Sequence, residues 1–468
     1  MRAFSSKRSS FTSPSRLRRP DHGQSVAAWA RRHAIPVSLG VLLCTIAGAT
    51  SNAQHCLVPA APLMLRDSDD APLEIVNPSM VAGENELIIA GAGSVQFQTG
   101  RPPYVSVPMH VVRLRGGTAR AVRPPYPGGR YLFARLIGVP GDPRLVWGEP
   151  DSVPQFDAQP NGRFSPYPRP VSVWAATFRN SRWSGGRRLA VAAGLSWMET
   201  TPTVVGTAVA TALPLGYAAV GGGRIDLLLS RRGSGWRRRT FDVGGIPVYT
   251  SATTSADAVF LGFITNETDS IARTRNTVFV MDSARTAAAW SRARPVTRAS
   301  DGAATMLSLL PTEGKAVHAV WGENRSGGLQ AEVIRRTRVD LSGANGREDG
   351  DLLSPGAPFT GLHAVSDRRG RIHVVYQVSR DDRPATYYAV WASPVGWGAP
   401  QRLGGDLPTR DASIAVSPKG EVIVTHSQLV GMSGPIPRFA TLVTRPDPHP
   451  DCLVRRKSSG IRQLRPNW

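Results

Sequence analysis

Seven short apolar runs recur along the chain at intervals of about 56 residues. Two of them share the string Val-Trp-Gly-Glu, with its tryptophans at 147 and 321, so these copies lie three intervals apart. A fixed period of this length is typical of repeat architectures, in which each copy forms one supersecondary unit. The runs are ELIIAGA (86–92), RLVWGEP (144–150), GYAAVGG (216–222), VFLGFIT (259–265), VHAVWGE (317–323), IHVVYQV (372–378) and EVIVTHS (421–427).

A second column of residues keeps the same period. Trp183, Trp236, Trp290 and Trp397 each follow a short turn, and their intervals are 53, 54 and 107 residues, the last being twice the others. A tryptophan of this kind buries a large apolar surface. We expect it to pack in the core and to pin an outer hairpin to the next blade.

The copy at 361–405 shows what one repeat contains. Valine, isoleucine, tyrosine and threonine alternate with small residues in four runs, and Gly, Pro and Asp separate the runs. This pattern predicts four antiparallel strands. The expected fold is therefore all-β, a single β-propeller of four-stranded blades. The columns favour seven blades; six result if 77–125 is an irregular extension.

The ends of the chain have compositions of their own. Residues 1–34 are basic, 35–49 are apolar, and Ser51 and Ala53 provide a small-x-small exit, which together indicate a signal peptide over 1–53. We expect the propeller over 54–450 and a basic, disordered tail over 451–468. No segment of the mature chain is long and apolar enough to span a membrane. The protein is expected to be secreted or held in the periplasm or cell envelope.

Two cysteines, Cys56 and Cys452, remain in the mature chain and lie near its two ends. In an exported protein such a pair predicts one disulfide. That bond would bring the ends together, as a ring requires. The last repeat has only about three strands of its own, and residues near 57–65 or 73–76 are expected to supply its fourth.

The formal net charge of +22 includes +7 from residues 1–53 and +4 from 451–468, so the body carries about +11, nearly all of it arginine. A basic surface attracts acidic polymers, but this arginine bias fits a solvated surface better than a nucleic-acid interface. No nucleic-acid partner is expected. The cysteine and histidine spacings predict no metal site, and no cofactor motif is present.

The repeats resemble those of the sialidase-like, or neuraminidase-type, propellers over roughly residues 77–445. That family carries an Asp-box, Ser-x-Asp-x-Gly-x-x-Trp, on the turn between the third and fourth strands. Here Ser283 stands at the matching distance from Trp290, but Arg285 and Ala287 replace the Asp and the Gly. The family's catalytic arginines and its Tyr/Glu pair cannot be matched to positions in this sequence. The resemblance therefore implies the fold and assigns no catalytic residue.

Propeller topology places certain polar residues on one face of the ring. The loops between blades and the loops joining second to third strands share this face, where propellers commonly bind ligands. Each candidate, taken alone, also fits a solvated loop residue, and the two Trp-Gly-Glu strings also fit structural corners. The candidate binding residues are Glu149, Glu199, Glu323, His363, Arg380, Arg410 and Asp411.

Three functions remain open as expectations, of which the last is a purely structural module of the cell surface. The first is a propeller that binds a carbohydrate or protein ligand without turning it over. The alternative is a glycoside hydrolase, sialidase-like in kind, whose acid and base lie on the same face, since glycoside cleavage needs two suitably spaced carboxyl groups.

Overall fold

The computed structural model describes residues 61–446 except for 94–95, 99–103, 107, 126–132, 140–141, 151–169, 180, 194–199, 206–207, 216–222, 232–235, 244–245, 256–257, 269–273, 285–288, 298–301, 313–315, 327–329, 341–350, 381–382 and 434–435. Every regular element in these ranges is a β-strand, as the sequence predicts. The described residues include no helix long and apolar enough to cross a membrane. Contacts divide the chain into two compact parts, Met1–His55 and Cys56–Trp468, and all described residues belong to the second.

The strands form seven four-stranded repeats, which we number from the first complete one. Repeat 1 contains β2 (Val76–Ala82), β3 (Glu86–Ala92), β6 (Met109–Arg115) and β7 (Thr118–Ala121). Repeat 2 contains β8 (Phe133–Val139), β9 (Asp142–Pro150), β10 (Pro170–Arg179) and β11 (Arg182–Trp183), with β12 (Arg187–Ala193) also beside β10. Repeat 3 contains β13 (Thr200–Val205), β14 (Ala208–Leu215), β15 (Gly223–Arg231) and β16 (Trp236–Val243).

The second half of the ring continues in the same order. Repeat 4 contains β17 (Ile246–Thr254), β18 (Ala258–Thr268), β19 (Thr274–Ala284) and β20 (Arg294–Pro295). Repeat 5 contains β21 (Ala303–Pro311), β22 (Ala316–Asn324), β23 (Val333–Asp340) and β24 (Leu352–Leu353). Repeat 6 contains β25 (Phe359–Ser366), β26 (Ile372–Arg380), β27 (Arg383–Ala392) and β28 (Gly396–Trp397), with β29 (Gln401–Leu403) also beside β27. Repeat 7 contains β30 (Thr409–Val416), β31 (Val422–Ser433), β32 (Ile436–Thr444) and β1 (Leu63–Met64). A small hairpin, β4 (Gln96–Gln98) and β5 (Tyr104–Ser106), stands apart.

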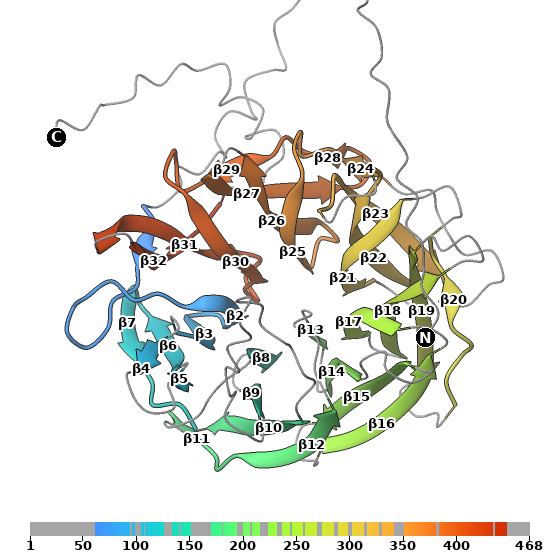
Figure 1. Cartoon of the computed structure of the whole chain (residues 1–468), viewed down its shortest axis with the longest axis horizontal. Coiled ribbons are helices and arrows are strands. Elements are labelled where there is room, and N and C mark those ends of the chain that lie inside the picture. The colour runs from blue at the N-terminus through green and yellow to red at the C-terminus, as the bar shows by residue number, and fades with distance from the viewer. Residues whose placement is uncertain are drawn as a thin grey trace, which may run out of the picture. The chain divides into compact units, whose positions relative to one another are not determined.

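The first strands of the repeats close a ring (Figure 1). Strands β2, β8, β13, β17, β21, β25 and β30 each contact the next, and β30 contacts β2 again. Within each repeat neighbouring strands are antiparallel, but β13 and β17 pair in parallel and join repeats 3 and 4 into one eight-stranded sheet. Counted as hydrogen-bonded sheets, the blades therefore number six instead of the favoured seven. The reason is the joining of repeats 3 and 4, since the stretch 77–125 contains the regular sheet of repeat 1. Six of the seven apolar runs fall on second strands, and the run 216–222 lies outside the described residues.

The N-terminal end of the described chain completes the last repeat. Leu63 of β1 pairs with Val443 of β32, so the ring is closed by a strand from the opposite end of the chain, as predicted. In Figure 1 this blue segment lies against the red strands of repeat 7. Leu65, just after β1, is fully buried in a cluster that joins repeats 7 and 1. Cys56 and Cys452 lie outside the described residues, and their disulfide stays a prediction.

The core lies between neighbouring repeats. Each buried apolar cluster combines side chains from two successive repeats, because each sheet is apolar on both of its faces. Trp183, Trp290 and Trp397 pack partly buried against these clusters. The expected direction is wrong for Trp290, whose ring lies 4.9 Å from that of Phe241 in the preceding repeat. The outer hairpin thus packs against the repeat before it.

Candidate functional site

The first strands of five repeats share an irregularity near their starts. The register shifts between Val76 and Ser79, Pro247 and Tyr249, Thr305 and Leu307, Thr360 and Leu362, and Arg410 and Ser413. Each shift is a β-bulge, which inserts one residue, bends the strand and re-aims a side chain. We call the face of the ring where first strands begin and second strands end the entry face; the bulges lie toward it.

Four of these bulges hold a residue in the left-handed region of backbone conformation. Asn77, Met306, Gly361 and Asp411 have φ values of 48°, 52°, 63° and 52°. For a non-glycine residue this conformation costs on the order of 1–3 kcal/mol and persists only where the surroundings fix it. The entry face therefore carries a repeated, rigid feature around the start of the innermost strands.

Arg410 and Asp411 meet at one of these bulges, where repeat 7 joins repeat 1. The Arg410 guanidinium donates a hydrogen bond to Glu74, and its Nε lies 3.3 Å from a carboxylate oxygen of Asp411. It also stacks 3.9 Å from the centre of the Phe439 ring. The Arg410 side chain is 41% exposed, whereas those of Glu74 and Asp411 are 12% and 17% exposed. The result is an arginine fixed in direction and still open to solvent.

Glu74 was not among the candidates from the sequence. It lies 336 residues from Arg410 along the chain and reaches it only because β1 closes the ring. The sequence offers one signal for Glu74, which is its position immediately before the first complete repeat.

Glu323 is a buried ion-pair partner. Its side chain is 1% exposed and accepts hydrogen bonds from Arg335 at 2.6 Å and from Arg325 at 2.9 Å. Burial by itself would raise the pKa of Glu323, but the hydrogen bonds from Arg335 and Arg325 outweigh it and leave that pKa lowered. This carboxylate stays ionised and has no proton to donate, so here Trp-Gly-Glu forms a structural corner.

Glu149 has a different environment at the equivalent position. It is half-buried, and its carboxylate accepts a hydrogen bond of 3.0 Å from the indole N–H of Trp147. Burial raises the pKa of Glu149, and the hydrogen bond from Trp147 only partly opposes that shift. A carboxyl group with a raised pKa can hold a proton nearer to neutral pH.

The glycine between Trp321 and Glu323 is required by packing. A Cβ on Gly322 would lie 2.8 Å from the Cβ of Ala331 and 3.0 Å from Cε of Met306, the residue at the neighbouring bulge. The repeated string thus combines a buried tryptophan, a glycine that allows close packing, and a glutamate whose role differs between the two copies.

The structure describes the remaining candidates only in part. His363 is half-buried on β25, opposite Val375. Arg380 ends β26 opposite Arg383, and its side chain is outside what the structure describes, as is Glu199. Glu149 and Glu323 belong to repeats 2 and 5, and each has its own local partners. Of the predicted residues, Arg410 and Asp411 are brought together.

A buried polar network that the candidates did not include lies at the other face, on the turn between β25 and β26. The ring nitrogens of His373 lie 2.8 Å from the Tyr388 hydroxyl and 3.2 Å from Asp367, which also accepts a 2.6 Å hydrogen bond from Arg371. Burial would raise the pKa of Asp367, but hydrogen bonds from His373 and Arg371 hold it well below its usual range. Burial lowers the pKa of His373.

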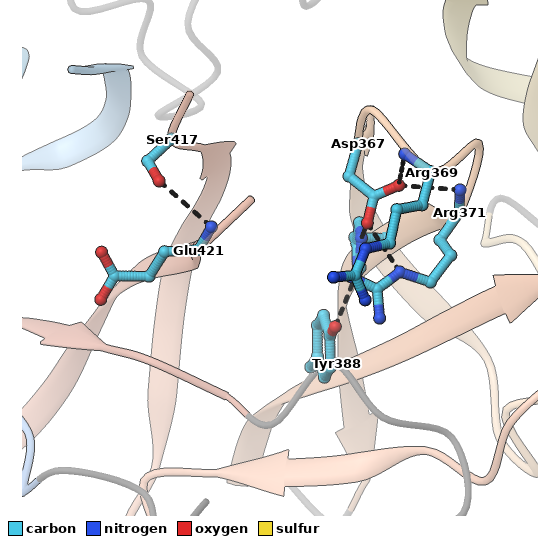
Figure 2. Close-up of polar contacts among 7 residues, drawn as sticks. Asp367, Arg369, Arg371, Tyr388, Ser417 and Glu421 are labelled. Carbon is cyan, nitrogen blue, oxygen red and sulfur yellow. Dashed lines mark hydrogen bonds and ion pairs between the residues drawn. The ribbon is translucent and has the colours of Figure 1, made fainter. Parts of the chain in front are cut away.

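This network stabilises a turn. Asp367 accepts backbone hydrogen bonds of 2.9 Å from both Arg369 and Arg371, and Ser417 accepts one of 3.1 Å from Glu421 at the corresponding turn of repeat 7 (Figure 2). Because the same kind of cap recurs in the neighbouring repeat, we interpret Asp367 as a structural residue. The Asp-x-x-Gly string at 367–370 is the signal that could have revealed it. The described residues contain no group of three or more His, Cys, Asp or Glu that could hold a metal ion.

The fold places this part of the chain in the class of β-propellers. No protein-family model matches the chain, and no curated protein matches its sequence. Among solved structures, a Dyadobacter fermentans protein of unknown function is similar, with a TM-score of 0.45 and 12% identity over 83% of this chain and 98% of that chain.

Two enzymes are also similar at this distance. Trypanosoma rangeli sialidase in complex with the inhibitor DANA has a TM-score of 0.41 and 9% identity over 75% of this chain and 59% of that chain. The catalytic domain of Coprinopsis cinerea GH62 α-L-arabinofuranosidase has a TM-score of 0.35 and 8% identity over 83% of this chain and 96% of that chain. Similarities at such low identity and TM-score do not indicate a ligand or an activity for this chain.

Proposed function

We propose that this chain is an exported, sialidase-like β-propeller that binds a carbohydrate or protein ligand on its entry face and does not turn it over. Export rests on the signal peptide expected over residues 1–53, and the protein would act in the periplasm, at the cell envelope or outside the cell. The observation that carries the proposal is the geometry of Arg410.

Arg410 has the properties of a ligand-binding group. Its guanidinium has five N–H donors in a fixed fork, of which Glu74 and Asp411 engage only part. Stacking on Phe439 and the two carboxylates restrict its rotation, so little side-chain entropy is lost when an acceptor binds. A ligand carboxylate or a pair of hydroxyl oxygens would suit the exposed donors.

The absence of turnover is supported by Glu323. Acid catalysis requires a carboxyl group that can hold and release a proton near the working pH. Glu323 is buried and held ionised by Arg325 and Arg335. Glu323 therefore suits a structural role at this corner better than a catalytic one.

The test is binding by the mature chain, residues 54–468, immobilised and exposed to a mixed glycan pool that includes sialylated glycans. We expect saturable retention that weakens at least tenfold in Arg410→Ala and in Arg410→Lys, because lysine lacks the planar fork. Arg369→Ala is the matched control, since Arg369 is exposed on the turn after β25 at the other face. Equal retention by the Arg410 and Arg369 variants would contradict the proposed role of Arg410.

The alternative, a glycoside hydrolase, is favoured by one observation, the raised pKa of Glu149. If Glu149 is the general acid, Glu149→Gln should abolish turnover while the melting temperature stays the same. Absence of turnover by the unaltered chain on every glycan tested would exclude this alternative.

A further inference from the structure

The hairpin of repeat 7 extends beyond its own blade. The pairing of β30 with β31 begins at Thr409 and Gln428, yet β31 continues to Ser433 and stays paired with β32 up to Ile436. The backbone N–H of Leu429 donates to the carbonyl of Pro408, just before β30. Beyond this contact, residues 430–433 and 436–439 form a two-stranded extension at the entry face, which we call the ribbon.

The ribbon and its base gather exposed apolar side chains. Among the described residues, five large hydrophobic side chains are exposed, and three of them are here: Leu407 at 47%, Val430 at 39% and Met432 at 59%. Exposed aliphatic groups are costly in water, and their concentration at one place marks an interaction surface. A protein segment suits such groups better than a sugar, whose hydroxyl groups need polar partners.

One edge of the ribbon is open. In repeat 7, β31 lies between β32 and β30. The open edge is the one facing β30, because the pairing of β30 with β31 does not extend beyond Gln428. Between Val430 and Ser433, no described strand lies on that edge of β31, and a β-bulge between Leu429 and Gly431 bends it. An unpaired strand edge is a template for an added strand, which gains main-chain hydrogen bonds.

The ribbon itself carries charge of one sign, and the acidic side chains near its base, Glu74, Asp411 and Asp406, each lie beside an arginine. Residues 428–439, QLVGMSGPIPRF, include Arg438 and no acidic residue, and Arg438 is exposed. Arg410 lies at the ribbon's base, stacked on Phe439. In the loop 404–408 the one acidic side chain, Asp406, lies 3.4 Å from Arg402. The complement of this surface is apolar and acidic.

We propose that the ribbon binds an extended segment of a partner protein in which apolar and acidic residues alternate, added as a strand along the open edge of β31. This inference rests on the proposed function, because it names the ligand class of the same face. Alternation follows from strand geometry, since successive side chains point to opposite sides. One side of the segment covers Val430 and Met432, and the other lies on the face of the ribbon that carries Arg438.

The test uses three labelled ten-residue peptides and the mature chain, with binding followed by fluorescence anisotropy. The first peptide alternates Glu and Val, the second alternates Lys and Val, and the third is the Glu-Val peptide with alternate backbone amides N-methylated. We expect saturable binding of the first peptide and at least tenfold weaker binding of the other two. The Lys-Val peptide should bind more weakly because its charge has the same sign as that of the ribbon. The N-methylated peptide should bind more weakly because it lacks main-chain N–H donors.

Variants locate the site. Met432→Asp should weaken binding of the Glu-Val peptide at least tenfold, whereas Val395→Asp, at a side chain 68% exposed on the turn between β27 and β28, should leave it unchanged. Equal melting temperatures would confirm that both variants fold. Lack of saturable binding, equal affinity for the Lys-Val peptide, or an unchanged affinity in Met432→Asp would each overturn the proposal.

Three further outcomes separate the possibilities. A concentration-dependent dimer in sedimentation velocity that Met432→Asp abolishes would mean that a second copy covers the ribbon, which overturns the partner proposal. Glycan retention that depends on Arg410 but not on Met432, together with no peptide binding, would overturn this inference and leave the proposed function standing. If Arg410→Ala changes neither glycan nor peptide binding, the proposed function fails instead.

Discussion

Glu149 and Glu323 follow the same two residues, Trp and Gly, and occupy equivalent strands, yet their neighbours give them opposite properties. Two arginines keep Glu323 ionised, whereas an indole N–H and partial burial leave Glu149 with a raised pKa. Identity of a short string therefore predicts position in the fold, and the charge state depends on groups that the string does not contain.

Replacing Glu323 should destabilise the fold. Glu323→Gln keeps the shape but removes the buried negative charge beside Arg335, and breaking a buried ion pair costs about 3–5 kcal/mol. Glu149→Gln is the comparison and should cost little, because the amide oxygen can still accept the hydrogen bond from Trp147. Urea unfolding of both variants measures the difference. Equal losses would contradict the assignment of Glu323 as the structural residue.

His426 should make the protein sensitive to acid. Burial lowers its pKa from 6.5 to about 4 in the folded state, so the unfolded chain binds the extra proton first as pH falls. The contribution of neutral His426 is complete above pH 6.5 and is lost as pH falls toward 4, by roughly 3 kcal/mol from a shift of this size.

The measurement is the free energy of unfolding between pH 7 and pH 4. His426→Gln should flatten its dependence on pH, because the titrating group is gone. The same slope in the variant and the unaltered chain would show that His426 does not titrate as described.

At the scale of elements, β1 has two residues but completes a blade. Its pairing with β32 brings the buried Leu65 into the cluster between repeats 7 and 1. The bulges at the starts of first strands have a comparable role for the entry face, since they fix where Asp411 and its counterparts lie.

Weakening the packing of the segment that contains β1 should destabilise the folded protein. Leu65→Ala removes a fully buried side chain, which costs about 2–5 kcal/mol. Leu63→Ala, at a partly buried position on β1 itself, should cost less. Thermal unfolding of the two variants measures the difference. A loss in Leu63→Ala as large as that in Leu65→Ala would contradict the packing described for this closure.

The strands were predictable because their alternation and punctuation are local properties of the sequence. The bulges were not, since the register shift at Met306 or Asp411 depends on which residues of the next strand lie opposite. The direction in which Trp290 packs was wrong for a similar reason: it depends on how neighbouring sheets face each other, which no local pattern encodes.

At the scale of the whole molecule, a regular period predicts a closed ring, and the first strands do close one. The candidate site was predictable only in part. Arg410 and Asp411 are adjacent in sequence, but Glu74 joins them from 336 residues away, and that contact exists only once the ring is complete.

The predicted bond between Cys56 and Cys452 belongs to this scale too. It would hold the two ends of the mature chain together, and bonds of this kind contribute roughly 2–4 kcal/mol. Reduction should therefore lower the melting temperature of the unaltered chain and leave that of Cys56→Ser unchanged. A melting temperature that reductant does not alter would mean that these cysteines are not bonded.

The central claim, binding without turnover, is tested most directly by mass spectrometry of the glycan pool before and after passage over the immobilised mature chain. We predict that some glycans are retained in an Arg410-dependent way and that every glycan recovered has its original mass. Products of altered mass, formed by the unaltered chain and absent with Glu149→Gln, would contradict it and make the protein a glycoside hydrolase.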